Sequence, residues 1–172
     1  MTPPVLHTRR LRLRAPHTGD FDVLSTFLMS ERARHVGGPL SDATQCSRTL
    51  GNLAGMWMLR GFGAFVFTQR DDDRALGMAG PWQPMTWPEP EIAWSVWAPE
   101  AEGTGLAHEA ALAARDHAFR DLGWTTAVSY IDPENVRSIR LAERLGATRD
   151  TGATPPPGSG PIHVYRHAPE AA

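Results

Sequence analysis

The chain reads Glu102-Gly103-Thr104-Gly105-Leu106-Ala107 at the point where a predicted strand passes into a predicted helix. Residues 91–97 before it alternate in the manner of a strand, and residues 105–122 after it repeat small and apolar residues at helical spacing. Glycine lets the backbone curl around an anion with no Cβ in the way, and the first N–H groups of a helix have no partners within it. The stretch is therefore consistent with an anion site made of main chain, and also with a plain strand–turn–helix junction.

Two nucleotide-binding motifs can be compared with this spacing. A Walker A loop ends in Gly-Lys-Ser or Gly-Lys-Thr, whereas Gly105 is followed by Leu106 and Ala107. A dinucleotide-binding turn needs a third glycine at position 108, which is His108, and it belongs to an early βαβ unit. Neither motif fits well. The natural ligand for an anion site made of backbone groups at this turn is a diphosphate.

Periodicity outside this stretch predicts one α/β domain over residues 1–172 with a mixed sheet, in the order β-α-α-β-β-β-α-β-α-β. The predicted strands cover residues 11–14, 63–68, 76–80, 91–97, 125–131 and 163–167. Helices are predicted to begin near Thr18, at Ser41 or Asp42, at Gly105 and after Asn135. Residues 81–90, rich in proline and tryptophan, are predicted to form a rigid loop, and residues 168–172 to fray.

Charge and composition exclude some classes of function. A formal net charge of -2 gives no sign of a surface that follows nucleic-acid phosphates, so no nucleic-acid partner is predicted. The arginines of residues 9–14 alternate with leucines and are predicted to lie on the exposed side of a strand. The aspartates of residues 71–73 are predicted to form a solvated hairpin turn. The histidines show no ligand spacing on one helix, so no metal is predicted.

The single cysteine, Cys46, excludes an internal disulfide and fits a reducing cytoplasm. No signal peptide is visible at the start, and no apolar stretch approaches the ~20 residues that a membrane-spanning helix needs. We therefore expect a cytoplasmic protein without a membrane partner, either a monomer or a homodimer.

Four blocks of the sequence resemble the GCN5-related N-acetyltransferase (GNAT) superfamily, and within it the RimJ/RimL-type branch, the ribosomal-protein alanine acetyltransferases. Residues 8–14 are similar to the first strand of that branch, and residues 91–96 to its central strand. Residues 103–110, Gly-Thr-Gly-Leu-Ala-His-Glu-Ala, resemble its Gly-x-Gly-Tyr-Ala-Thr-Glu-Ala motif. Residues 132–147 resemble its Asn-x-x-Ser and Glu-Lys-Leu-Gly-Phe motif. The blocks stand in the family's order and cover most of the chain.

The resemblance implies an acetyl-CoA-dependent N-acetyltransferase with a twisted, mostly antiparallel mixed sheet, whose central strands splay apart around the cofactor arm. The thioester and pantetheine would pair with the backbone N–H groups of Val96 and Trp97. The residues that would hold the pyrophosphate are Gly103, Thr104, Gly105, Leu106 and Ala107. Asn135 and Ser138 would contact the cofactor arm near the sulfur, and Asn135 is also a natural N-cap for the helix that follows.

The chain departs from the family's pattern at three positions. Glu100 stands where Gln or Arg is common, and Glu102 where an aromatic residue is common. Two carboxylates beside a pyrophosphate are unfavourable unless they point outward, so we expect backbone groups rather than side-chain charge to bind the anion. Ala142 stands where many members carry the tyrosine that acts as general acid.

The predicted reaction is direct attack of a primary amine, from a small molecule or a peptide N-terminus, on the thioester in a ternary complex. A base must first take the amine's proton. Glu91 is the first candidate and Glu89 a weaker one, although Glu91 is equally consistent with a surface carboxylate at a strand end. Ser138 or water would protonate the thiolate, or it would leave unprotonated, since a thiol pKa of ~8.5 makes the thiolate a tolerable leaving group without an acid.

The acceptor pocket is predicted to be apolar and to include Trp57, Trp82, Met85 and Trp87. A different possibility is a catalytically silent acyl-CoA-binding or interaction module of the same fold. The carboxylates at the glycine turn and the missing tyrosine favour that second function, whereas the intact glycines and the Asn/Ser block oppose it.

Overall fold

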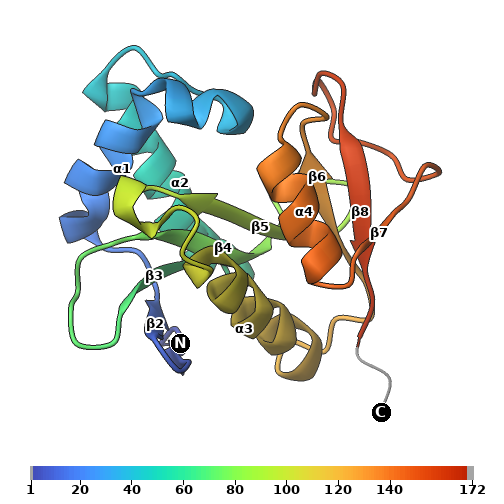
Figure 1. The fold of residues 1–172 in the computed structure, drawn as a ribbon, viewed down its shortest axis with the longest axis horizontal. Helices are drawn as coiled ribbons and strands as arrows, with labels where there is room; N and C mark the ends of the chain where they lie inside the picture. The colour runs from blue at the N-terminus through green and yellow to red at the C-terminus, as the bar shows by residue number, and fades with distance from the viewer. Residues whose placement is uncertain (1, 170–172) are drawn as a thin grey trace.

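The computed structural model describes residues 2–169, and Figure 1 shows how their helices and strands are arranged. The strands are β1 (Leu6–His7), β2 (Leu11–Arg14), β3 (Phe65–Gln69), β4 (Gly77–Trp82), β5 (Glu91–Val96), β6 (Ala127–Ile131), β7 (Thr148–Arg149) and β8 (His163–His167). The α-helices are α1 (Phe21–Leu28), α2 (Ala43–Arg60), α3 (Leu106–Arg120) and α4 (Val136–Arg144). Short 3-10 helices lie at η1 (Thr18–Asp20), η2 (Glu31–Val36) and η3 (Pro99–Ala101).

The predicted fold class is confirmed, and the predicted order of elements is found with the short strands β1 and β7 added. One sheet holds the strands in the order β1-β2-β3-β4-β5-β6-β8-β7. All neighbours run antiparallel except β5 and β6, which run parallel. Of the segment 168–172 that was predicted to fray, residues 170–172 lie outside the described part of the chain.

The sheet is covered on both faces, and β3 shows how one strand serves both cores. Phe65 and Phe67 pack in the core that contains Ala114 of α3. Val66 lies between them in the sequence and packs in the core that contains Leu24 of α1. This is the alternation that a strand buried on both faces requires, because successive side chains point to opposite sides of the sheet.

The central strands β5 and β6 separate after a single residue pair. Glu91 faces Val128 in the parallel ladder, and the Val128 N–H donates to the Pro90 carbonyl at 2.9 Å. The two strands then run apart, while α4 lies over β6 on the far side of the opening (Figure 1). The sheet therefore has an opening between its two central strands, as the predicted fold class requires.

The predicted end of the strand at residues 76–80 was wrong by two residues. β4 continues through Pro81 and Trp82, which face Ile92 and Glu91 of β5. Proline is tolerated here because Pro81 lies beyond the last β3 partner, Phe65 facing Ala79, so one side of β4 needs no ladder donor.

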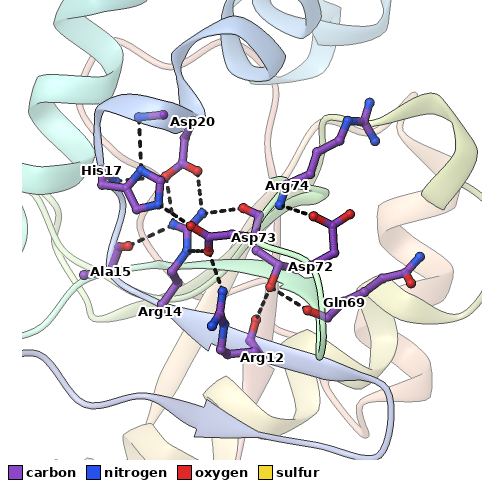
Figure 2. Close-up of polar contacts among 11 residues, drawn as sticks. Arg12, Arg14, Ala15, His17, Asp20, Gln69, Asp72, Asp73 and Arg74 are labelled. Carbon is purple, nitrogen blue, oxygen red and sulfur yellow. Dashed lines mark hydrogen bonds and ion pairs between the residues drawn. The ribbon is translucent and has the colours of Figure 1, made fainter.

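A network of charges buries Arg14, one of the arginines that were predicted to be exposed. Figure 2 shows Arg14 of β2 between two carboxylates, those of Asp20 and Asp73. Its guanidinium donates to both Asp20 oxygens, at 3.0 and 2.7 Å, and to Asp73 at 2.6 Å. Asp73 also binds Arg12 and His17, and hydrogen bonding from Arg14 is the main reason that its pKa is lowered.

The network corrects one expectation, since Arg14 is buried rather than exposed, whereas residues 71–73 form the predicted exposed turn between β3 and β4. Arg14 is buried because the charged network joins β2 and η1 to the turn between β3 and β4, elements far apart in the sequence. Periodicity along one strand cannot reveal such a partner.

Replacing Asp20 by Asn should destabilise the fold strongly. The Asp20 side chain is 1% exposed, and removing its charge leaves Arg14 with an uncompensated share of positive charge. We expect Asp20→Asn to lower the free energy of unfolding by about 3 kcal/mol, as breaking buried ion pairs does. Urea denaturation followed by circular dichroism measures it. The matched control is Asp73→Asn, whose side chain is 56% exposed and should cost about 1 kcal/mol or less. Equal losses would contradict the burial argument.

Candidate active site

A cavity of about 1360 Å³ follows the opening beside β5. One wall is formed by η2 with Phe27 of α1, and the other by α4 along its length with the loop before it. Its floor comes from Trp94, Ser95 and Val96 of β5, and one end is closed by the glycine turn and the first turn of α3. The cavity therefore joins the two sequence blocks, residues 103–110 and 132–147, that are far apart along the chain.

The glycine turn has the backbone conformation that its sequence predicts. Gly103 and Gly105 have φ values of 72° and 81°, in the left-handed region that residues with a Cβ adopt at a cost. The Thr104 hydroxyl donates to the Ala101 carbonyl at 2.6 Å, and the Thr104 carbonyl accepts from Arg10 at 3.1 Å. Both contacts fix the conformation of the turn. The Leu106 N–H donates to the Thr104 hydroxyl oxygen at 3.5 Å, and the N–H groups that follow it in the first turn of α3 have no partner within the helix.

Six of the predicted cofactor residues meet at this cavity, and three do not line it. Those that do are Val96, Gly103, Gly105, Ala107, Asn135 and Ser138. Thr104 and Leu106 lie in the turn without forming the wall, and Trp97 lies below it.

Trp97 has its backbone donor in use elsewhere. The Trp97 side chain is 2% exposed in the core beneath α1 and α2, and its N–H donates to the Leu76 carbonyl at 2.8 Å. Successive N–H groups of a strand point to opposite sides. The Val96 N–H therefore points away from β4 and into the opening, whereas the Trp97 N–H is not free to meet a ligand.

The start of α4 presents polar side chains to the cavity. The Asn135 carboxamide oxygen accepts from the Ser138 N–H at 3.2 Å, which makes Asn135 the N-cap. The Ser138 hydroxyl oxygen accepts from the Trp94 indole N–H at 3.2 Å. Because this hydroxyl accepts one bond, its own hydrogen can be donated to a further group.

The two acidic residues before the turn are both neutralised. Glu100 is exposed and pairs with Arg74, away from the cavity. Glu102 lines the cavity and is held at 2.7 Å by the guanidinium groups of both Arg32 and Arg137. Partial burial alone would raise the pKa of Glu102, but the hydrogen bonds and charges of these arginines outweigh it and lower the pKa.

Arg32 is a site residue that no sequence pattern indicated. Besides Glu102, it donates to the carbonyl oxygens of Trp97 at 2.7 Å and Val96 at 3.1 Å. Its guanidinium also lies 5.3 Å from the centre of the Phe27 ring. Arg32 thus connects η2 to the end of β5 and to the residue before the glycine turn, and it forms part of the cavity wall.

A second contact spans the cavity beyond Arg32. The His35 Nδ1 lies 2.8 Å from a carboxylate oxygen of Asp132, which connects η2 to the loop that follows β6. The pKa of Asp132 is lowered, mainly by this hydrogen bond. The two walls are therefore linked by polar contacts from η2.

Glu91 is a buried carboxyl rather than a surface one. It is 7% exposed, and burial raises its pKa to about 7, although a hydrogen bond of 2.6 Å from the Trp87 indole acts in the opposite direction. Ile92 packs with Ala118 of α3, so the neighbouring Glu91 points to the other face of the sheet, the side of α1 and α2. The raised pKa comes from the loss of water around the charge.

The four predicted acceptor residues do not converge on the cavity, and none of them lines it. Trp57 donates to the Ala64 carbonyl at 3.2 Å and packs edge-on against Phe65, and Trp82 packs against the core beneath α1 and α2. Met85 is 76% exposed. The Trp87 indole donates to Glu91, a predicted catalytic group.

Comparison with known proteins identifies the family. A family model described as an acetyltransferase (GNAT) domain matches residues 10–148. The chain is similar to a crystal structure of an acetyltransferase from Agrobacterium tumefaciens str. C58, with 33% identity, a TM-score of 0.90, and coverage of 98% of this chain and 96% of the other. A GNAT-family acetyltransferase from Bordetella pertussis has 29% identity and a TM-score of 0.78 over 96% and 99% of the two chains.

The chain therefore belongs to the GNAT family and is an N-acetyltransferase. RimL, a ribosomal L7/L12 alpha-N-protein acetyltransferase solved in complex with coenzyme A, has the same fold, with a TM-score of 0.74 at 14% identity over 96% and 98% of the chains. Within residues 2–169, no three His, Cys, Asp or Glu side chains are grouped as a metal would need. No helix in the same range has both the length and the apolar character to cross a membrane.

Replacing Glu91 by Gln should stabilise the protein at high pH more than at low pH. A buried Glu whose pKa is about 7 stays protonated while the unfolded chain, with a Glu pKa of about 4.3, ionises. Folding stability therefore falls as pH rises from 4.3 to 7 and stays low above pH 7. We expect Glu91→Gln to raise the free energy of unfolding by about 2 kcal/mol more at pH 8 than at pH 5. Urea denaturation at both pH values measures it.

Glu89→Gln is the control, because the Glu89 carboxylate is paired with Arg166 at 2.7 Å and should show no such gain at pH 8. A Glu91→Gln effect of equal size at both pH values would show that the carboxyl ionises normally in the folded protein.

Proposed function

We propose that this chain transfers the acetyl group of acetyl-CoA to a primary amine by direct attack in a ternary complex. The observation that supports it best is the continuity of one cavity from the left-handed glycine turn, along Val96, to Trp94, Asn135 and Ser138. A neutral arm with a diphosphate at one end and a thioester at the other fits a cavity that has backbone donors at one end and polar side chains at the other.

The orientation of the donor follows from how α4 lies along the cavity. Ser138, in its first turn, touches Trp94 of β5, while the Arg144 carbonyl near its end lies 3.5 Å from His108 of α3. The diphosphate would meet the turn of Gly103 and Gly105, and the thioester would reach the region of Trp94 and Ser138. The Val96 N–H, directed into the opening, would hold the arm, and Trp97 is left out of this set because its N–H is engaged.

The reaction forms an N–C bond and breaks the C–S bond of the thioester, so the amine must lose a proton and the thiolate must leave. Glu91 is proposed as the base, since a carboxyl with a pKa of about 7 is ionised above pH 7 and still accepts a proton efficiently. Its burial beneath Trp87 means that the proton travels through a water molecule or after the indole moves. The Val96 N–H would stabilise the oxyanion.

Ser138 is proposed to donate a hydrogen bond to the leaving sulfur. Its hydroxyl oxygen is oriented by Trp94, which leaves its hydrogen for the thiolate. Ala142 is buried and cannot serve as an acid. A serine hydroxyl is a weaker acid than a thiol, so its role is hydrogen bonding, and the proton itself comes from water.

The acceptor is proposed to be a small amine or a peptide N-terminus, as in the RimJ/RimL-type branch. It would approach from the side of η2, because this wall carries Phe27, Arg34 and Val36 over the middle of the cavity. The covered position of Glu91, which does not line the cavity, and the absence of a tyrosine at position 142 favour a catalytically silent acyl-CoA-binding module.

A binding measurement followed by an acceptor screen separates these two functions. Acetyl-CoA at millimolar concentration should raise Tm in thermal denaturation, because a ligand that binds only the folded state stabilises it. Free-thiol release should then identify acceptors among small amines and N-terminal peptides. Stabilisation without thiol release on any amine would support the silent module. No stabilisation would remove the acetyl-CoA proposal itself.

With an acceptor in hand, the pH dependence of kcat/KM tests Glu91. Because the base must be ionised, activity should fall as pH drops through about 7, the pKa of Glu91. Trp87→Phe removes a hydrogen bond that lowers this pKa, so the acid limb should move to higher pH. Glu91→Gln should lower kcat by about 10² to 10⁴-fold and remove the limb. Glu89→Gln should keep it, and a limb that persists in Glu91→Gln would assign the base elsewhere.

A further inference from the structure

We propose that Arg140 and Arg144 form a second anion subsite, which holds the phosphate on the ribose of coenzyme A and selects CoA thioesters over donors that lack this phosphate. The inference rests on the proposed function, because it assigns residues to the same donor. It concerns a part of the cavity that the glycine turn does not account for.

The arginines lie on one face of α4. Arg137, Arg140 and Arg144 are separated by three and four residues, the spacing that places helical side chains on one side. All three line the cavity. The seven-residue step from Arg137 to Arg144 corresponds to about 10 Å along the helix axis. Arg144 is at the end where the α4 backbone meets His108 in the first turn of α3. The arginine face therefore runs along the wall of the cavity, from Arg137, which binds Glu102, to Arg144 beside the first turn of α3.

The charges on this face are not all neutralised. Arg137 is paired with Glu102, which it shares with Arg32. For Arg140 and Arg144, no carboxylate within residues 2–169 lies at ion-pair distance. Glu134 and Glu143 also line the cavity, but neither is paired with these arginines. Two guanidinium groups thus face the cavity as donors for an added anion.

The chemistry of the donor explains which anion would fit. The pantetheine arm is neutral and needs no cation, and the diphosphate is accounted for by backbone N–H groups at the turn. Coenzyme A carries a third phosphate, a monoester on the ribose, which lies next to the diphosphate. Guanidinium groups present a planar pair of N–H donors that matches phosphate oxygens. His108, in the first turn of α3, lies between the turn and Arg144 and completes the path.

The test compares acetyl-CoA with 3′-dephospho-acetyl-CoA by isothermal titration calorimetry, which needs no acceptor. For the wild-type chain, loss of the phosphate should raise Kd by about 10- to 100-fold at low salt. The double variant Arg140→Gln/Arg144→Gln should raise Kd for acetyl-CoA by the same factor. It should leave Kd for the dephospho donor unchanged within about twofold, because the group it contacts is missing there.

Arg120→Gln is the matched control, since Arg120 is an exposed arginine of α3 that does not line the cavity, and it should change neither Kd. Circular dichroism checks that each variant is folded. Equal wild-type affinity for the two donors, or an equal loss for both donors in the double variant, overturns the subsite while leaving the proposed function intact. Failure of the wild-type chain to bind either donor overturns the proposed function and the subsite together.

Discussion

The backbone ladder between β5 and β6, at the centre of the sheet, consists of one residue pair, and the site depends on that constraint. Glu91 faces Val128, and beyond this pair β5 and β6 separate. Neither strand is left unsupported, because β5 pairs with β4 along its whole length and β6 pairs with β8 along its whole length. The backbone groups that would otherwise form a ladder across the opening need other partners. A ligand with amide groups along its arm meets that need, which is why an opening in the middle of a sheet serves as a binding site.

The opening is bounded by side chains from distant parts of the chain, and Arg32 is central among them. It binds the carbonyl groups of Val96, the last residue of β5, and of Trp97, which follows it. It also binds Glu102, and Glu102 in turn binds Arg137 of α4. A carboxylate beside the phosphate-binding turn is tolerable under these conditions, because its charge is used to position two cations. The feature that looked unfavourable in the sequence is thus part of how the two walls of the cavity are joined.

Local patterns predicted most of the fold, and contacts between distant residues account for what they missed. The strand at residues 163–167 and the N-caps Asp42 and Asn135 were confirmed, because alternation and capping are properties of neighbouring residues. Arg14 was expected to be exposed, but its partner Asp73 lies 59 residues away. Arg32 and Glu102 are 70 residues apart and carry no motif.

Sequence patterns likewise predicted only part of the candidate site. The glycine turn and the start of α4 could be found because their chemistry resides in contiguous backbone, which sequence motifs record. The proposed acceptor residues were grouped by their apolar character alone. Trp57 and Trp82 instead pack against the two cores, because a large aromatic side chain stabilises a core as readily as it lines a pocket. The wall over the middle of the cavity comes from η2, a segment without regular periodicity.

The choice of cation also bears on the chemistry of the site. The 172 residues contain no lysine and 17 arginines. An enzyme that acylates primary amines holds a reactive thioester close to its own side chains, and a lysine there would be a competing acceptor. Guanidinium groups stay protonated and are not acylated under these conditions. Arg32, Arg137, Arg140 and Arg144 can therefore surround the donor and supply positive charge without presenting a nucleophile to it.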